Sequence, residues 1–315
     1  MTAASDRSPR RVVIVVGLGH SGSTLLDLML SGHPAIVGVG EAQKMTAPAK
    51  RIERLADEAK RCTCGEAIPG CRLWGRYRDA IAASPDADRD TAYGFLLDAL
   101  RAAEPQTAWL SDSSKNEDAL RELAAMHAAG VIDDLRVLHL VRDVRSLAAS
   151  QLGRANVAGR LRRWRTLAAS FRLWRSQSER HLREIAALGL PSLPVGYEEL
   201  CFFPEATMQS VAAFLDLPFD PAMLAPSPAG GHVTTGNPMR LDAGKSTRLA
   251  YDHRWFFNPT ISRLYGLWPG VRRLNERLVY SRSKPDPAAA TFRPPAIERE
   301  PASASPTSNA SPISA

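Results

Sequence analysis

Residues 11–26 read RVVIVVGLGHSGSTLL, and this stretch decides the fold. Its first part is a run of β-branched apolar residues, which is typical of a strand buried on both faces. Glycines and small hydroxyl residues follow, and a leucine-rich helical pattern begins near Ser23. A strand, a tight loop and a helix in this order direct the N–H groups of the loop and the helix dipole toward one anion. The stretch therefore predicts a loop that binds a phosphate-like group.

The spacing of this loop is similar to that of a Walker A motif. Gly17 and Gly22 stand at the two glycine positions, and Thr24 stands where the hydroxyl that binds Mg²⁺ belongs. Ser23, however, occupies the position of the lysine. The loop can hold a phosphate, but it lacks the cation that nucleoside triphosphate chemistry places on the β- and γ-phosphates. A P-loop kinase-like phosphotransferase therefore remains only an alternative.

The rest of the chain alternates strand-like and helix-like segments. Strands are expected at 11–17, 36–39, 107–111, 135–141 and 193–197, and helices at 23–32, 46–61, 90–103, 116–129, 144–152, 158–188 and 204–215. Strands separated by helices indicate a parallel sheet covered on both faces. The sequence predicts one α/β domain over residues 11–282, with a P-loop-like parallel sheet flanked by helices and a helical insertion at about 45–105.

Composition narrows the class of protein. The chain has 315 residues, 44% of them hydrophobic, and a formal net charge of +7, which suits an anionic ligand. No motif of a nucleic-acid module is present, so no nucleic-acid partner is expected. No run approaches the ~20 apolar residues that span a bilayer. Residues 1–10 are expected to be flexible, and they lack the apolar core of a signal peptide, so the protein is expected to be cytoplasmic. Residues 283–315 are expected to be disordered.

A second informative stretch is LRVLHLVRDVRSLAAS at residues 135–150. Its strand pattern delivers Arg142 to the carboxyl edge of the sheet, where open α/β folds bind ligands. Asp143 is expected to cap the next helix, and Ser150 follows Arg142 by eight residues, about two helical turns. The guanidinium and the hydroxyl can then converge on one phosphate. The alternative is an Arg142–Asp143 ion pair with a serine inside the helix.

Together these segments resemble the 5′-phosphosulfate loop and the 3′-phosphate motif of sulfotransferases that use 3′-phosphoadenosine 5′-phosphosulfate (PAPS). The resemblance is to bacterial members and in part to tyrosylprotein sulfotransferases. It implies that Arg142 and Ser150 bind the nucleotide together with the loop residues Gly19, His20, Ser21, Gly22, Ser23 and Thr24. Most relatives carry Lys or Arg where this chain has His20. Its imidazole is expected to supply a hydrogen bond or, when protonated, a charge to the transferring group.

Two later segments resemble the same family. VGYEEL at residues 195–200 is similar to a Tyr-Glu-Asp-Leu segment whose tyrosine lies near the nucleotide, which implies that role for Tyr197; an aromatic residue that merely ends a strand is the alternative. GNPMR at residues 236–240 resembles a loop that closes over the nucleotide in bacterial members. This likeness implies that Asn237 and Arg240 contact the nucleotide.

The resemblance also implies a catalytic pair. Glu41 stands where tyrosylprotein and some bacterial sulfotransferases carry a catalytic glutamate, and a carboxylate there can take the proton of the acceptor hydroxyl. Lys115 matches a lysine that contacts the sulfuryl group or its leaving oxygen, where charge develops. An exposed residue or a helix N-cap is the alternative for Glu41. The implied reaction transfers a sulfuryl group from PAPS to a hydroxyl or amine and releases PAP. The non-enzyme alternative is a nucleotide-binding protein without transfer activity.

The cysteines leave three possibilities open. Cys62, Cys64 and Cys71 cluster in the insertion, and Cys201 is a distant fourth. They would form a disulfide, a weak zinc site or reduced thiols; the spacing is not the paired Cys-x₂-Cys pattern, so no metal is predicted. A similar segment is frequent in bacterial sulfotransferase-like proteins, where it would act as a structural staple. The expected acceptor is a small molecule, a carbohydrate or a lipid, and nothing indicates an oligomeric state.

Overall fold

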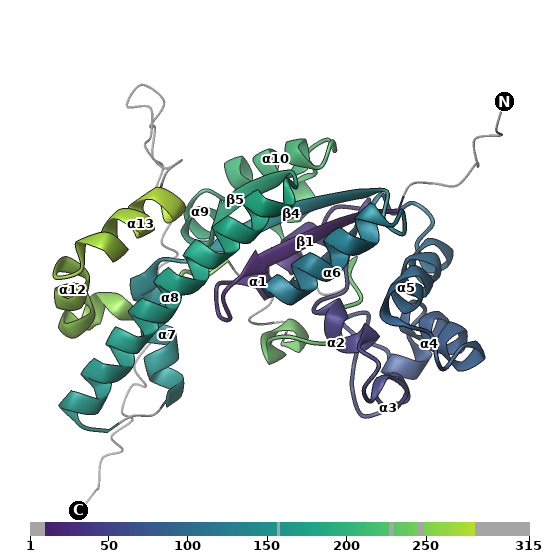
Figure 1. Ribbon diagram of the computed structural model, residues 1–315, viewed down its shortest axis with the longest axis horizontal. Coiled ribbons are helices and arrows are strands. Elements are labelled where there is room, and N and C mark those ends of the chain that lie inside the picture. Colours follow the sequence, from purple (N-terminus) through teal and green to yellow (C-terminus); the bar gives the residue numbers. More distant parts are fainter. Residues whose placement is uncertain (1–9, 156–157, 227–229, 243, 245–248, 281–315) are drawn as a thin grey trace, which may run out of the picture. The chain divides into compact units, whose positions relative to one another are not determined.

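The computed structural model describes residues 10–155, 158–226, 230–242, 244 and 249–280. In this part of the chain, five strands form one parallel sheet with the order β2-β3-β1-β4-β5. Strands β1, β4 and β5 of this sheet are labelled in Figure 1. The strands are β1 (Arg11–Gly17), β2 (Ile36–Gly38), β3 (Trp109–Lys115), β4 (Asp134–Val141) and β5 (Ser192–Gly196). The predicted α/β class with a parallel sheet flanked by helices is confirmed.

Helices follow each strand. They are α1 (Ser23–Leu30), α2 (Ala42–Thr46), α3 (Arg51–Leu55), α4 (Trp74–Ala83), α5 (Arg89–Ala103), α6 (Glu117–Ala128), α7 (Val144–Ala155), α8 (Arg160–Leu188), α9 (Tyr197–Phe202), α10 (Pro204–Phe214), α12 (Pro259–Gly266) and α13 (Pro269–Val279). Short 3₁₀ turns are η1 (Ile68–Gly70), η2 (Pro221–Leu224), η4 (Pro238–Leu241) and η5 (Arg254–Phe257). Among the described helices, none combines the length and the apolar composition needed to cross a membrane.

The alternation of side chains along β1 explains why both faces of the sheet are covered. Val12, Ile14 and Val16 join a core with residues of α5 and α6, whereas Val13 and Val15 pack with α1 and α10. Successive side chains of a strand point to opposite faces, so an uninterrupted apolar run requires helices on both sides. The apolar run at residues 12–16 therefore requires this layered arrangement.

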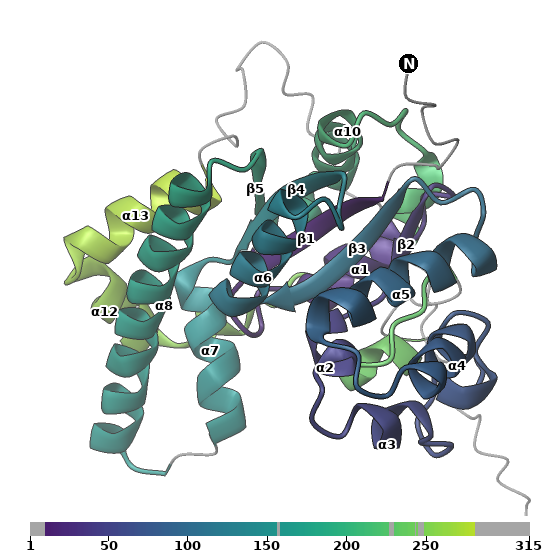
Figure 2. The same ribbon diagram turned by 45° about the vertical axis from the view of Figure 1, so that its right-hand side comes forward.

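The insertion differs from the expectation. One helix was expected at 46–61, but the structure has the short helices α2 and α3 and then a turn. Pro48 has no N–H to donate to a helical ladder, and Lys50 adopts a left-handed backbone with φ of 56°. Helices α3, α4 and α5 lie together next to the β2–β3 side of the sheet (Figure 2). The helical nature of the insertion was predicted correctly, but its first helix was not.

The end of the described chain forms a third core that the sequence pattern did not reveal. Helices α12 and α13 pack on α7 and α8 through Leu147, Phe171, Trp174, Ile261 and Val271. Each of these two helices begins with a proline, a residue that is well suited to the first turn of a helix. The predicted flexible N-terminus, apart from Arg10, and the predicted tail at 283–315 lie outside the described residues.

Strand β3 runs four residues beyond the predicted end at 111, because its polar residues are buried partners of α1. The carboxylate of Asp27 accepts hydrogen bonds from the Ser111 hydroxyl at 2.8 Å and from the Gly40 N–H at 3.1 Å. The polar residues Asp112, Ser113 and Ser114 follow the expected end of the strand, but they are buried and belong to β3. Asp27 thereby ties α1 to β3 and to the loop that carries Glu41.

Asp27 makes stability depend on pH. Burial raises its pKa to about 7, although hydrogen bonds from Ser111 and Gly40 lower it. Between about pH 4 and pH 7 the folded protein therefore holds a proton that the unfolded chain has released, so stability falls as pH rises. We expect the free energy of unfolding to fall by up to about 1.4 kcal/mol per pH unit relative to Asp27→Asn between pH 5 and 7. Urea unfolding at each pH measures this difference, and parallel pH curves for the two proteins would contradict it.

Candidate active site

A cavity of about 800 Å³ lies at the carboxyl edge of the sheet. Each of the five strands leads into a segment that lines it. Most of the residues that were expected to be functional line this cavity: Gly19, His20, Gly22, Ser23, Thr24, Glu41, Lys115, Arg142, Ser150, Tyr197 and Asn237. Parallel strands end at one edge of a sheet, so residues far apart in the sequence meet there.

Two of the expected nucleotide-binding residues do not line this cavity. Ser21 is only 1% exposed, and its N–H donates to the Leu18 carbonyl at 3.2 Å, so it shapes the turn of the loop. Arg240 is buried, and its Nη2 donates to the Thr234 carbonyl at 2.8 Å. Both residues support segments that reach the cavity, and neither presents its side chain to it in this state.

The loop after β1 depends on one glycine. Gly22 precedes α1 with φ of 97°, a left-handed conformation that L side chains rarely adopt. A Cβ at this position would lie 2.4 Å from Cδ2 of Tyr197, so the tyrosine ring packs directly on the loop. Ser23 and Thr24 then open α1 at the cavity wall. The N–H groups at this helix start favour an anion.

Arg142 is held beside the loop by all three guanidinium nitrogens. Its Nη1 donates to the His20 carbonyl, its Nε to the Ser146 hydroxyl and its Nη2 to the carboxylate of Asp252, each at 2.8 Å. Its guanidinium carbon also lies 4.4 Å from the ring centroid of Tyr197, a cation–π distance. The cation is therefore rigidly placed between the loop and the segment that follows residue 249.

Asp143 behaves as the predicted helix cap and does not form the alternative ion pair with Arg142. It accepts the Arg145 N–H at 2.7 Å at the start of α7. Its charged partner is the Arg145 side chain, at 2.6 Å. Ser150, two turns further along α7, lines the same cavity as Arg142. That the two side chains converge on one phosphate remains a prediction.

Asp252 was missed by the sequence analysis. Burial raises the pKa of its carboxyl, but a hydrogen bond from Arg254 and the charge of Arg142 lower it more, to about 2. It is therefore ionised at neutral pH and balances the charge of Arg142 in this structure. It stands 110 residues from Arg142 in the chain, so no local spacing would have indicated the pair.

Glu41 and Lys115, which both line the cavity, form an ion pair. Lys115 Nζ lies 3.0 Å from one carboxylate oxygen of Glu41, and Lys44 Nζ lies 2.6 Å from the other. The Glu41 side chain is only 13% exposed. Burial raises the pKa of Glu41, but the hydrogen bonds and charges of the two lysines lower it more, so it lies below its usual value. Glu41 is thus an ionised carboxylate between two cations.

The backbone explains how these charges meet. Glu41 does occupy the N-cap position of α2, but its side chain makes no capping bond and faces the lysines instead. Lys115 ends β3 with φ of 72°, a left-handed conformation that is rare for a residue with a side chain and often occurs at functional sites. Lys44, one turn into α2, was missed by the sequence analysis.

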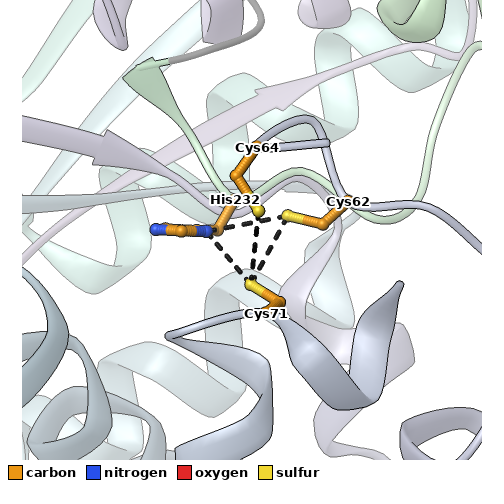
Figure 3. A group of neighbouring side chains, drawn as sticks. All are labelled: Cys62, Cys64, Cys71 and His232. Carbon is orange, nitrogen blue, oxygen red and sulfur yellow. Dashed lines mark hydrogen bonds between the residues drawn. The ribbon is translucent and has the colours of Figure 1, made fainter. Parts of the chain in front are cut away.

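The cysteines of the insertion meet a histidine that the sequence analysis did not consider. Cys62, Cys64 and Cys71 surround the imidazole of His232, whereas Cys201 packs in another part of the core beside Tyr197 (Figure 3). Cys201 is therefore not part of the group that Cys62, Cys64 and Cys71 form. His232 follows Cys71 by 161 residues, and only the fold brings them together.

Among solved structures, the chain is similar to the sulfotransferase domain from the Synechococcus PCC 7002 olefin synthase (17% identity, 83% of this chain and 96% of that chain, TM-score 0.46). It is also similar to the sulfotransferase domain from the curacin biosynthetic pathway (17% identity, 82% of this chain and 98% of that chain, TM-score 0.44). A third similar structure is sulfotransferase STF1 from Mycobacterium tuberculosis H37Rv (17% identity, 69% of this chain and 70% of that chain, TM-score 0.40). A search of curated protein sequences gave no match.

The family model carries the assignment. It is described as the sulfotransferase family and matches residues 12–221, which is more than half of the chain. The matched range contains the loop after β1, the Glu41–Lys115 pair, Arg142 and Tyr197. The segment with Asn237 and Asp252 lies beyond it. With this match over the core of the fold, the chain belongs to the sulfotransferase family and is a sulfotransferase.

Proposed function

We propose that this sulfotransferase transfers a sulfuryl group from PAPS to a hydroxyl or amine of its acceptor and releases PAP. The observation that carries the proposal is the convergence of two anion-binding elements on one cavity: the loop with the start of α1, and the Arg142–Ser150 pair. A donor with phosphosulfate at the 5′ position and phosphate at the 3′ position requires two such elements. A nucleoside triphosphate would instead favour a lysine at the position of Ser23.

The residues of the cavity fit such a donor. The left-handed backbone of Gly22 turns the loop into α1, and the first turn of α1 offers N–H groups to an anion. Tyr197 stacks on Arg142 at the cavity wall, where a nucleotide would lie. We assign the 3′-phosphate to Arg142, which would exchange its bond with Asp252 for the phosphate. His20 would donate a hydrogen bond or a charge to the phosphosulfate.

The Glu41–Lys115 pair suits the chemistry. PAPS supplies a sulfuryl group whose bond to the phosphate oxygen breaks as the bond to the acceptor oxygen forms. The lowered pKa of Glu41 keeps its carboxyl ionised, and this carboxylate would take the proton that the acceptor loses. Lys115 would place its charge near the oxygen that leaves, where negative charge develops. When a sulfuryl group enters between them, the ion pair of this state would separate.

The acceptor is proposed to enter past Lys44 of α2, Gly153 of α7 and Gly236, which line the cavity. Small molecules, carbohydrates and lipids with a hydroxyl or amine are the candidates. A nucleotide-binding protein without transfer activity would bind PAP but release none from PAPS with any acceptor of these classes.

The donor assignment is tested by thermal unfolding with PAP, ADP and AMP. PAP at about a hundredfold its Kd is expected to add about 2.7 kcal/mol of stability. ADP and AMP at the same concentrations are expected to add less, because they have no 3′-phosphate for Arg142. ATP and GTP serve as controls for the kinase-like alternative. Equal shifts for PAP and ADP would remove the 3′-phosphate assignment, and a larger shift with ATP would favour the kinase-like alternative.

A further inference from the structure

Four side chains of types that can bind a metal ion, three thiols and one imidazole, converge outside the active-site cavity. They are Cys62, Cys64 and Cys71 from the insertion and His232 from the segment after η2 (Figure 3). Their sulfur atoms and the imidazole nitrogen all lie within 4.8 Å of one another. The side chain of His232 is 2% exposed, and Cys62 and Cys71 are buried. Nothing in the proposed transfer reaction uses this cluster.

The separations match the edges of a coordination tetrahedron. The Sγ atom of Cys71 lies 3.6 Å from that of Cys62 and 3.7 Å from that of Cys64. His232 Nδ1 lies 3.6 Å from the Cys62 sulfur and 3.2 Å from the Cys71 sulfur. Zinc bonds of about 2.3 Å to sulfur and about 2.0 Å to nitrogen give tetrahedral edges of about 3.8 Å and 3.5 Å. A disulfide would need about 2.05 Å between two of the sulfurs.

We propose that Cys62, Cys64, Cys71 and His232 bind one structural zinc ion through their three sulfurs and Nδ1. Three cysteines and one histidine complete a four-coordinate shell and leave no open position, which is the pattern of structural rather than catalytic zinc sites. Thiolate-rich tetrahedral sets favour zinc over the harder ions Mg²⁺ and Ca²⁺. The ion would join the insertion to a segment of the chain more than 150 residues away.

The imidazole is already oriented for this role. His232 Nε2 lies 3.0 Å from the carboxylate of Glu104, which also pairs with Arg72 at 2.5 Å. An N–H on Nε2 that donates to Glu104 leaves the lone pair of Nδ1 directed at the sulfurs. Metal-bound histidines commonly have such a carboxylate partner, which fixes the ring and its tautomer.

The backbone around the cluster is also organised for it. The Cys62 N–H donates to the Glu66 carbonyl at 2.9 Å, and Gly65 has a left-handed φ of 96°, so a tight turn presents two sulfurs on one side. The Thr63 hydroxyl donates to the Gly231 carbonyl at 2.9 Å. The indole of Trp74 donates to the His232 carbonyl at 2.7 Å. The two ligand-bearing segments are thus held together by hydrogen bonds that leave the sulfurs free to coordinate.

The position of the cluster indicates what the ion would stabilise. Three residues after His232, the Thr235 hydroxyl accepts the N–H of Glu41 at 3.0 Å. Asn237 follows at the cavity wall. Removal of zinc is therefore expected to loosen the insertion and the wall that carries Asn237. This last consequence rests on the proposed function, whereas the presence of the ion does not.

Zinc content tests the proposal without any substrate. The untagged full chain, purified in reducing buffer after expression with zinc, is measured by mass spectrometry of the metal. We expect about one zinc per chain in wild type and in the control Cys201→Ser, and loss of zinc in Cys64→Ser and His232→Ala. Cobalt substitution of wild type is expected to give thiolate charge-transfer absorption that is absent in Cys64→Ser. A zinc-free wild type, zinc retained in both ligand variants, or a Cys62–Cys71 disulfide in the native protein would overturn the proposal.

A milder variant keeps the test valid if ligand variants fail to fold. Glu104→Gln retains all four ligands but weakens the orientation of His232. Its zinc affinity, measured by competition with a chromogenic chelator, is expected to fall by about 10- to 100-fold. Glu66→Gln is the matched control. Glu66 lies next to the cluster, but only its backbone carbonyl accepts a hydrogen bond from Cys62, so this variant is expected to keep the wild-type zinc affinity. Equal affinities for all three proteins would overturn the assignment of His232 as a ligand.

Discussion

Glu41→Gln is expected to lower sulfuryl transfer by about 10²- to 10⁴-fold, because the amide has the shape of the carboxylate but cannot take a proton. The affinity for PAP is expected to change by less than about threefold, since Glu41 faces Lys44 and Lys115 and not the proposed nucleotide contacts. Release of PAP from PAPS with an active acceptor measures turnover, and isothermal titration measures PAP affinity.

The exposed glutamate of α3 offers a matched control for this experiment. Glu53→Gln makes the same chemical change outside the cavity and is expected to leave turnover and PAP affinity unchanged. Full turnover in Glu41→Gln would place the base elsewhere. A parallel loss of turnover and PAP affinity would instead indicate that the Glu41–Lys115 ion pair holds the shape of the nucleotide site.

Arg142→Ala is expected to weaken PAP binding by about 10- to 100-fold, which corresponds to loss of a charge-assisted hydrogen bond of about 1.5–3 kcal/mol. The affinity for ADP is expected to fall far less, because ADP lacks the phosphate that Arg142 is proposed to hold. Titration of both nucleotides against both proteins separates these effects. A similar loss for PAP and ADP would mean that Arg142 acts through its bond to the His20 carbonyl, by supporting the loop.

Asp252→Asn provides the opposite perturbation. It removes the negative charge that neutralises Arg142 in this structure, at 2.8 Å from Nη2. We expect PAP to bind more tightly to this variant than to wild type. The neutral amide of the variant would bind the guanidinium more weakly than the carboxylate of Asp252 does, so the 3′-phosphate would displace it more easily. Weaker PAP binding would show that Asp252 is needed to position Arg142.

Several features could be read from the sequence because they lie within one continuous element. The apolar run of β1, the glycines after it and the leucines of α1 each report a local conformation. The spacing of eight residues between Arg142 and Ser150 is likewise local, because it spans only the link between β4 and α7 and the first turns of α7. This reasoning failed at two places. Pro48 and Lys50 interrupt the helix that was expected at 46–61, and β3 continues to Lys115, beyond its expected end at residue 111.

The sequence by itself therefore determined the class of the fold, the position of the glycine-rich loop between β1 and α1, and the order of the cavity residues along the chain. The tertiary structure decided which charges pair and which ligands meet. Asp252 joins Arg142, Lys44 joins Glu41, and His232 joins the three cysteines of the insertion. The physical reason is that local propensity and spacing act over one helix or strand, whereas these partners are set by how whole elements pack at the sheet edge.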